Sequence, residues 1–189
     1  MIKKTFGKFT KWNVLKGLIF REIDDLIISS TGIVSFLSFF VGGVVAIQTA
    51  INIENPLLPK NLIAFTTRQS IILEFAPTFI SVIMAGKVGS YITSSIGTMR
   101  VTEQIDALEV MGVNSVGYLI GPKIIASLFI FPIVIMYSMF FGFLGGGLVC
   151  FFTEIIPVEQ YIEGIRSFSE ENFGYVRYAL IKTSVFAFL

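Results

Sequence analysis

The feature that most constrains this chain is a run of 25 residues without a charged side chain, from Leu26 to Ala50. A helix of this length crosses the apolar core of a bilayer, because each residue adds about 1.5 Å and the core is about 30 Å thick. Apolar segments at residues 62–86 and 124–152 are of similar length. The composition agrees, since 54% of the 189 residues are hydrophobic and only 14% are charged. The sequence therefore predicts an all-α, polytopic integral membrane protein.

We expect one membrane domain over residues 1–189, divided by the pattern of charged and apolar residues. The predicted parts are an interfacial helix (1–25), two spans (26–86), a cytoplasmic region (87–123), a third span (124–152), an external loop (153–177) and the start of a fourth span (178–189). The last twelve residues are too few to cross a bilayer as a helix. We therefore expect that the sequence stops inside a fourth span and that the natural chain is longer.

Residues 1–25 predict a helix that lies in the membrane interface. Apolar and aromatic residues recur at close to helical period, with lysines between them that suit anionic lipid. A solvated basic leader is the alternative interpretation, although it leaves the periodic aromatic residues unexplained. We expect the acidic cluster Glu22, Asp24 and Asp25 to end this helix.

The second apolar segment is interrupted by Arg68, Glu74 and Pro77. An ionisable group inside a bilayer costs at least a few kcal/mol, so Glu74 is expected to face a protein interior or a wet cavity. Pro77 is expected to kink the helix. Glycines in the first span (Gly32, Gly42, Gly43) favour close approach of another helix, although local loosening of the helix is an equal alternative. In the third span, Gly142 and Gly146 have the four-residue spacing of close helix contacts.

A short polar helix is predicted from Gly97 to Gly112, between the second and third spans. Its apolar residues fall on one side of a helical wheel and its acidic residues on the other. The apolar side comprises Val101, Ile105, Leu108 and Met111, and the acidic side comprises Glu103, Asp106 and Glu109. Such a short helix needs a surface to lie on, which leaves the acidic side for a soluble partner.

The basic residues predict the orientation. Nine Lys and Arg residues lie in the N-terminal segment and the 87–123 region, whereas four lie in or near the opposite connections. Basic residues are enriched on the cytoplasmic side, so we expect a cytoplasmic N-terminus and a cytoplasmic helix at Gly97–Gly112. The four are Lys60, Arg68, Arg166 and Arg177.

Several functional classes are disfavoured by residues that the sequence lacks. It contains no histidine, which removes the commonest general base and metal ligand. The single cysteine, Cys150, allows no internal disulfide, and a net charge of +1 gives no reason to expect nucleic acid. Gly86-Lys87 lacks the remainder of a phosphate-binding loop. If this protein drives transport, another chain hydrolyses the nucleotide.

The run AGKVGSYITSSIGTMRVTEQIDALEVMGVNSVGYLIGPK at residues 85–123 resembles the signature region of MlaE-type (YrbE-type) permeases. The similarity extends to LEFAP at 73–77 and to LIKTSVFA at 180–187. These permeases are the membrane subunits of ABC transporters that move lipids between bacterial membranes. The resemblance implies about five transmembrane helices in the full family, with the last truncated or absent here.

The resemblance also implies partners and site residues. The partners are a second permease copy, a cytosolic ABC ATPase dimer that binds the ATP, and a periplasmic ring of Mce-domain proteins, at the bacterial inner membrane. The lipid cavity would hold Glu74 and Lys182, with Gln48 as a weaker candidate. The ATPase contact would involve Arg100, Glu103, Asp106 and Glu109. No metal or other cofactor is expected.

Some residues depart from the family pattern. Lysine stands where the family commonly has arginine, which keeps the charge but loses the planar guanidinium. Leu73 stands where the family has an arginine before the glutamate, which puts an Arg–Glu pair at the cavity in doubt. The other departures are Lys87, Ser95, Ser115 and Lys123.

The same residues allow two functions other than a lipid-transport permease. A non-transporting membrane scaffold would use Gly97–Gly112 as a static docking site and Glu74 as a satisfied buried group. A membrane enzyme would have only Glu74 and Lys182 to work with.

Overall fold

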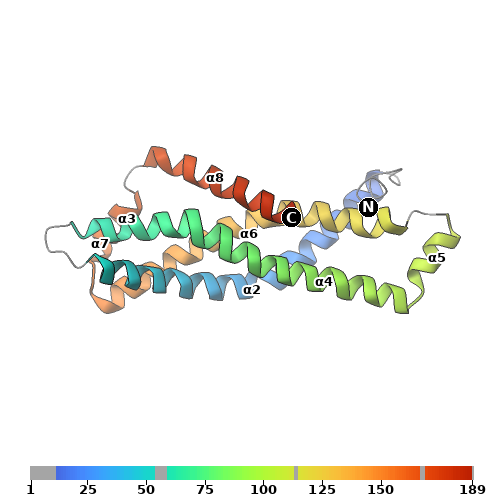
Figure 1. Ribbon diagram of the computed structural model, residues 1–189, viewed down its shortest axis with the longest axis horizontal. Coiled ribbons are helices and arrows are strands. Elements are labelled where there is room, and N and C mark those ends of the chain that lie inside the picture. Colours follow the sequence, from blue (N-terminus) through green and yellow to red (C-terminus); the bar gives the residue numbers. More distant parts are fainter. Residues whose placement is uncertain (1–11, 54–58, 113–114, 167–168, 189) are drawn as a thin grey trace. The chain divides into compact units, whose positions relative to one another are not determined.

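A computed structural model describes residues 12–53, 59–112, 115–166 and 169–188, and all regular elements within these ranges are helices (Figure 1). This confirms the all-α prediction. The elements are α2 (Trp12–Asn52), α3 (Asn61–Ser70), the π-helix η1 (Ile71–Ile80), α4 (Ser81–Val101), α5 (Gln104–Val110), α6 (Ser115–Thr153), α7 (Val158–Arg166) and α8 (Ser169–Phe188).

Three helical stretches in the described ranges are long and apolar enough to cross a membrane. They are Leu15–Asn52, Asn61–Val101 and Gly117–Thr153, and each contains one of the three predicted spans. The predicted start of a fourth span at 178–189 lies in the longer helix α8, apart from residue 189, which lies outside the described residues.

The predicted end of the first helix at the acidic cluster is wrong, because α2 runs without a break from Trp12 to Asn52. The charge of Glu22 is compatible with a continuous helix, because its carboxylate forms an ion pair of 2.6 Å with the ammonium of Lys123. Residues 1–11 of the predicted interfacial helix lie outside the described residues.

The second span was expected to end near residue 86, but the helix continues to Val101. Hydroxyl groups in this polar stretch donate to the carbonyl four residues earlier, which satisfies them without leaving the helix. Ser90 bonds to Gly86 at 2.8 Å, Thr93 to Gly89 at 2.8 Å and Thr98 to Ser94 at 3.0 Å. Likewise α6 begins at Ser115, before the predicted start of the third span.

The residue contacts divide the chain into two compact units. Unit 1 comprises residues 1–30 and 83–131, and unit 2 comprises residues 31–82 and 132–189. Each is described by itself below.

In unit 2, the backbones of α2 and α6 come into close contact at glycine residues. A methyl group added at Gly42 would collide with the carbonyl of Gly142, and one added at Gly145 would collide with the carbonyl of Phe39. The close approach predicted at Gly42 and Gly142 is therefore confirmed, whereas Gly32 has open space around it.

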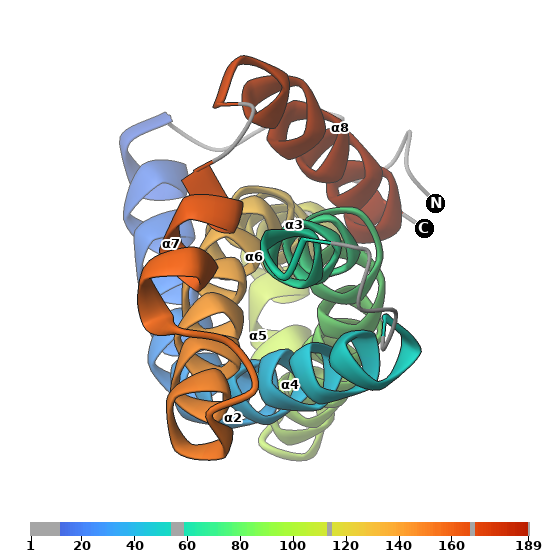
Figure 2. The same ribbon diagram turned by 90° about the vertical axis from the view of Figure 1, so that its left-hand side faces the viewer.

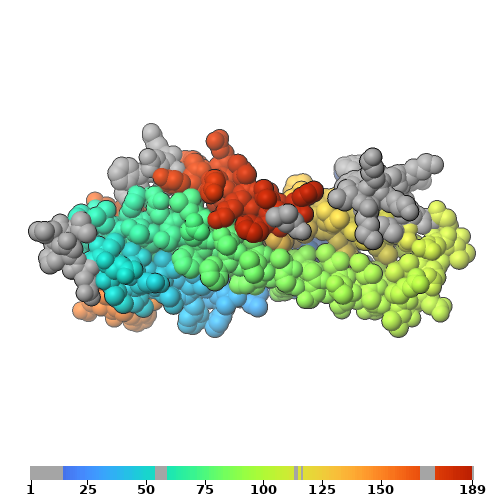
Figure 3. All heavy atoms as spheres, in the orientation of Figure 1, coloured from blue at the N-terminus to red at the C-terminus, as the bar shows by residue number. Residues whose placement is uncertain are grey.

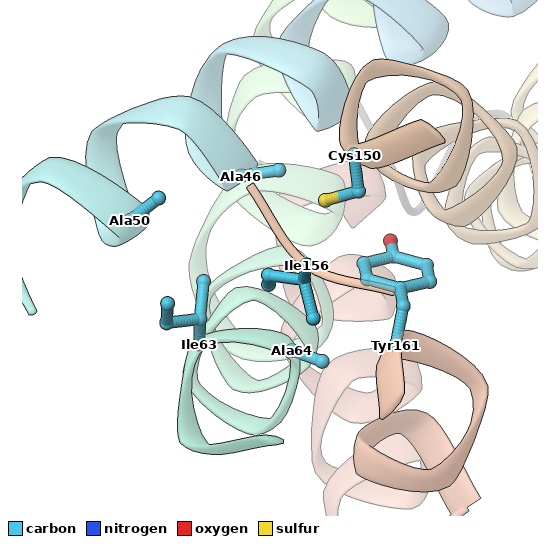
Figure 4. Packing of buried hydrophobic residues seen from close by; sticks show 7 residues of the cluster. All are labelled: Ala46, Ala50, Ile63, Ala64, Cys150, Ile156 and Tyr161. Atoms are coloured by element: carbon cyan, nitrogen blue, oxygen red, sulfur yellow. The ribbon is translucent and has the colours of Figure 1, made fainter. Parts of the chain in front are cut away.

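The core of unit 2 lies where α2, α3, α6 and α7 converge (Figure 4). Its buried cluster consists of Ala46, Ala50, Ile63, Ala64, Cys150, Ile156 and Tyr161. The Tyr161 hydroxyl donates to the Phe143 carbonyl at 3.1 Å. Burial raises the pKa of Tyr161, so the hydroxyl stays protonated and keeps donating this bond.

Two further packing contacts complete unit 2. Helix α3 packs against α7, as the end-on view shows (Figure 2), and α8 packs against η1. In the space-filling view α8, in red, forms a ridge on the surface of this unit (Figure 3). Since α8 covers only part of η1, some side chains of η1 remain exposed, among them Glu74.

Candidate functional site

The central element of the candidate site is η1, a π-helical segment within the second span. It contains both Glu74 and Pro77, which was expected to kink this span. Proline lacks an amide hydrogen and clashes with the carbonyl of the preceding turn, and a wider π-helical turn relieves both problems. Such turns are rare and are frequent at functional sites.

Two charges predicted from the family pattern lie together in unit 2. Nζ of Lys182, on α8, lies 3.8 Å from Oε2 of Glu74 on η1. The same ammonium donates a hydrogen bond of 3.2 Å to the carbonyl of Leu73. Residues that lie more than 100 positions apart in the sequence thus form one polar site beside an apolar span.

The two partners of this ion pair differ in exposure. The side chain of Glu74 is 72% exposed in the single chain, whereas that of Lys182 is 25% exposed. Glu74 was expected to face a protein interior or a wet cavity, and in the single chain it does not face the interior. Helix α8 packs against η1 and places Lys182 3.8 Å from one carboxylate oxygen of Glu74, while most of the surface of this side chain stays exposed.

Gln48, the weaker candidate, lies in a separate pocket of unit 2 with a volume of about 280 Å³. The pocket is rich in hydroxyl and amide groups and includes Phe75, the residue after Glu74. Its lining is Val45, Gln48, Thr49, Asn52, Ile53, Thr66, Ser70 and Phe75. The pocket and the ion pair therefore share η1.

The four residues predicted for a partner contact lie in unit 1, but not on one helix. Residues from Gly97 to Val101 form the end of α4, and a turn at Thr102 and Glu103 precedes the much shorter α5. The prediction of a single helix from Gly97 to Gly112 is wrong. Glu103 adopts a φ of 56°, in the left-handed region that non-glycine residues seldom occupy, and this separates α4 from α5.

The two faces predicted for this helix are only partly present. Ile105 and Leu108 are half-buried as expected, but Val101 is 84% exposed and Met111 is 67% exposed. These two side chains fall outside α5, at residues where the wheel of a continuous helix does not apply.

The acidic side chains of α5 make contacts within the chain. Asp106 forms an ion pair of 2.9 Å with Arg100, and Glu109 accepts a hydrogen bond of 3.0 Å from Ser115. Glu103 and Asp106 remain exposed, as does Glu109. The structure therefore brings Arg100 and Asp106 together and ties α5 to the ends of α4 and α6.

Sequence reasoning missed two buried charged groups. Arg68 is 2% exposed and donates to the carbonyl of Ile165 in α7 at 2.9 Å, and Lys123 is 2% exposed beside Glu22. The sequence signal that could have predicted their burial is a basic residue inside a helical apolar stretch, which applies to both. Arg68 was predicted only to interrupt the second apolar segment and to count among the external basic residues, and Lys123 only to count among the cytoplasmic ones.

Three helical stretches of the described residues are able to span a membrane, and the second carries Glu74 of the ion pair. These features define a polytopic integral membrane protein. The chain belongs to the MlaE permease family, whose model, Permease MlaE, matches residues 19–189.

Relatives of this chain carry consistent descriptions. A probable ABC transporter permease protein of Rickettsia bellii is 31% identical over 179 residues, which cover 91% of this chain and 65% of the relative. One from Synechocystis is 36% identical over 101 residues, covering 53% of this chain and 38% of that protein. One from Porphyra purpurea is 42% identical over 78 residues, covering 41% and 27%. The chain thus spans 65% of the length of the rickettsial relative.

Proposed function

We propose that this protein is the permease subunit of an ABC transporter that moves phospholipid or a related lipid between the inner and outer membranes of a bacterium. The observation that carries the proposal is the ion pair between Lys182 on α8 and Glu74 on η1, within the second stretch able to span a membrane, in a chain of this family. A charged pair beside apolar helices suits a molecule with a charged headgroup and apolar tails.

The chemistry of the two side chains supports a lipid headgroup as the ligand. The Lys182 ammonium is a donor for a phosphate oxygen, and the Glu74 carboxylate is an acceptor for an amine or hydroxyl group. The separation of 3.8 Å is longer than a direct hydrogen bond, so both groups keep bonding capacity for a ligand. Gln48 and the hydroxyl-rich pocket around it offer further neutral donors and acceptors close to η1.

The proposal includes the partners expected from the family. Two permease copies would enclose the lipid, a cytosolic ATPase dimer would bind and hydrolyse the ATP, and a periplasmic ring of Mce-domain proteins would receive or supply the lipid. The N-terminus and α5 would lie in the cytoplasm at the inner membrane. Arg100, Glu103, Asp106 and Glu109, all exposed, would lie at the contact with the ATPase.

Affinity purification of the full-length protein in mild detergent, followed by mass spectrometry of bound subunits and lipid, tests this function. We expect Glu74→Ala and Lys182→Met to lower the amount of co-purified phospholipid several-fold. The physical reason is that each hydrogen bond to a charged group contributes about 1.5–3 kcal/mol. Glu159→Ala, which removes an exposed carboxylate from α7, is the matched control and should leave the lipid content unchanged.

Unchanged lipid in both site variants would contradict a headgroup site at this pair. A wild-type protein that binds no ATPase subunit and carries no lipid would favour the scaffold function instead.

A further inference from the structure

Three helices of unit 1 meet at the ammonium group of Lys123. This side chain, on α6, is 2% exposed, and its Nζ lies 2.6 Å from Oε1 of Glu22 on α2. The same nitrogen lies 4.8 Å from the ring centroid of Tyr91 on α4, at a distance typical of a cation–π contact. One buried cation therefore joins α2, α4 and α6.

Two more contacts connect α2 to α4 in this unit. The Tyr91 hydroxyl donates to Oδ2 of Asp25 at 3.3 Å, and Nζ of Lys87 donates to the carbonyl oxygen of Ser29. Tyr91 thus contacts the buried cation with its ring and α2 with its hydroxyl.

The Glu22–Lys123 pair is not explained by stability alone. Oε2 of Glu22 is buried and has no hydrogen-bond partner within the described residues, so the carboxylate is only half satisfied. A buried pair of this kind contributes little net stability, because the loss of water around both charges offsets their attraction. Removing one partner is costly, however, since it leaves a single charge buried. A pair of this kind is therefore better suited to fixing one arrangement of the helices than to stabilising the fold.

A cavity of about 360 Å³ lies beside this pair and has α5 as one wall. Its other walls come from α2, the end of α4 and α6. The lining is Leu18, Glu22, Met99, Gln104, Ala107, Leu108, Met111, Tyr118, Leu119, Pro122 and Lys123. No residue from Gln104 to Val110 is buried, so α5 is not locked by close packing. It has space to move toward the pair.

We propose that Glu22 and Lys123 are positioning residues that make α2 follow α6 when a partner protein displaces α5. The route consists of two contacts. Glu109 on α5 accepts the hydrogen bond from Ser115 at the start of α6, and Lys123, about two turns further along α6, holds Glu22. This inference rests on the proposed function, because it assigns the displacement of α5 to the ATPase cycle.

The first test uses the full-length protein with its ATPase subunits, reconstituted in vesicles of bacterial phospholipid. Glu22→Gln should lower thermal stability, because Lys123 is left buried without a carboxylate. The double variant E22Q/K123M removes both charges, so it should recover stability and ATPase binding. Lipid transfer per ATP hydrolysed should nevertheless stay about fivefold or more below wild type, the size of a typical coupling between sites. Asp24→Asn, which changes an exposed carboxylate two residues from Glu22 on α2, is the control and should transfer lipid normally.

The second test does not depend on transport. Spin labels on Cys residues at Arg21 of α2 and Ile124 of α6, in a Cys150→Ala background, report the distance between these helices. In the otherwise unchanged protein the distance distribution should stay narrow when ATPase and ATP are added. In E22Q/K123M it should broaden or shift, because α2 no longer follows α6.

The two tests separate the inference from the function on which it rests. If wild type transfers no lipid, the proposed function fails, and the spin-label distances still decide the role of the pair. The positioning role is overturned if E22Q/K123M matches wild type both in transfer per ATP and in its distance distribution, since the pair would then be structural only.

Discussion

At the scale of single residues, buried charged side chains in this protein connect helices in two ways: they bond to backbone carbonyl groups, and they pair with opposite charges. Arg68 is 2% exposed, lies 4.8 Å from the ring of Phe65 and donates to the Ile165 carbonyl in the last turn of α7. Carbonyl groups in the last turn of a helix lack partners within that helix and carry partial negative charge. A guanidinium is therefore well suited to hold α7 against α3.

Replacing this guanidinium should loosen α7. Arg68→Met keeps most of the side-chain volume but leaves the Ile165 carbonyl without its donor, at a cost of about 1–3 kcal/mol. We expect a lower unfolding temperature in detergent and faster proteolysis near α7. Arg166→Met, which removes an exposed charge from the same helix, should change neither measurement. Equal stability of the two variants would show that Arg68 does not secure α7.

At the scale of elements, the close contact between α2 and α6 in unit 2 depends on glycine. The backbones meet at Gly42 and Gly142, and again where Gly145 faces the carbonyl of Phe39. Without hydrophobic driving force inside a bilayer, helices associate through such close packing. The predicted Gly142 and Gly146 spacing identified this face of α6, but Gly145 makes the tighter contact with α2.

Gly145→Ala should separate the two helices. The added methyl group would collide with the Phe39 carbonyl, and overpacking of this kind typically costs about 1–3 kcal/mol. Thermal unfolding in detergent measures the effect. Gly32→Ala, in α2 with nothing within 4 Å of the added group, should be neutral or slightly stabilising. A stable Gly145→Ala variant would mean that the helices shift apart at no cost.

At the scale of the whole molecule, the proposed function requires one orientation in the membrane. The count of basic residues predicts that the N-terminus and α5 lie in the cytoplasm and that α7 lies outside. Only this orientation lets α5 meet a cytosolic ATPase.

The orientation can be measured with single cysteines in a Cys150→Ala background. Cysteines at the exposed residues Glu103 and Glu159 should react differently with a membrane-impermeant maleimide. In intact spheroplasts we expect labelling at Glu159 only, and labelling at Glu103 after permeabilisation. The reverse pattern would place α5 outside the cell and would contradict its role at the ATPase.

The sequence by itself determined the all-α class, the three membrane-spanning stretches and the family, because these depend on the length and composition of continuous segments. It also offered Glu74 and Lys182 as candidate site residues, through the cost of charge in a bilayer and the resemblance to the family, and their role stays a prediction. The tertiary structure decided which charges meet. Lys182 on α8 pairs with Glu74 on η1, and Lys123 on α6 pairs with Glu22 on α2. Local periodicity also failed at Glu103, where a left-handed backbone ends one helix before α5 begins. The two ion pairs join residues far apart in the chain, so no pattern within a single segment could specify them.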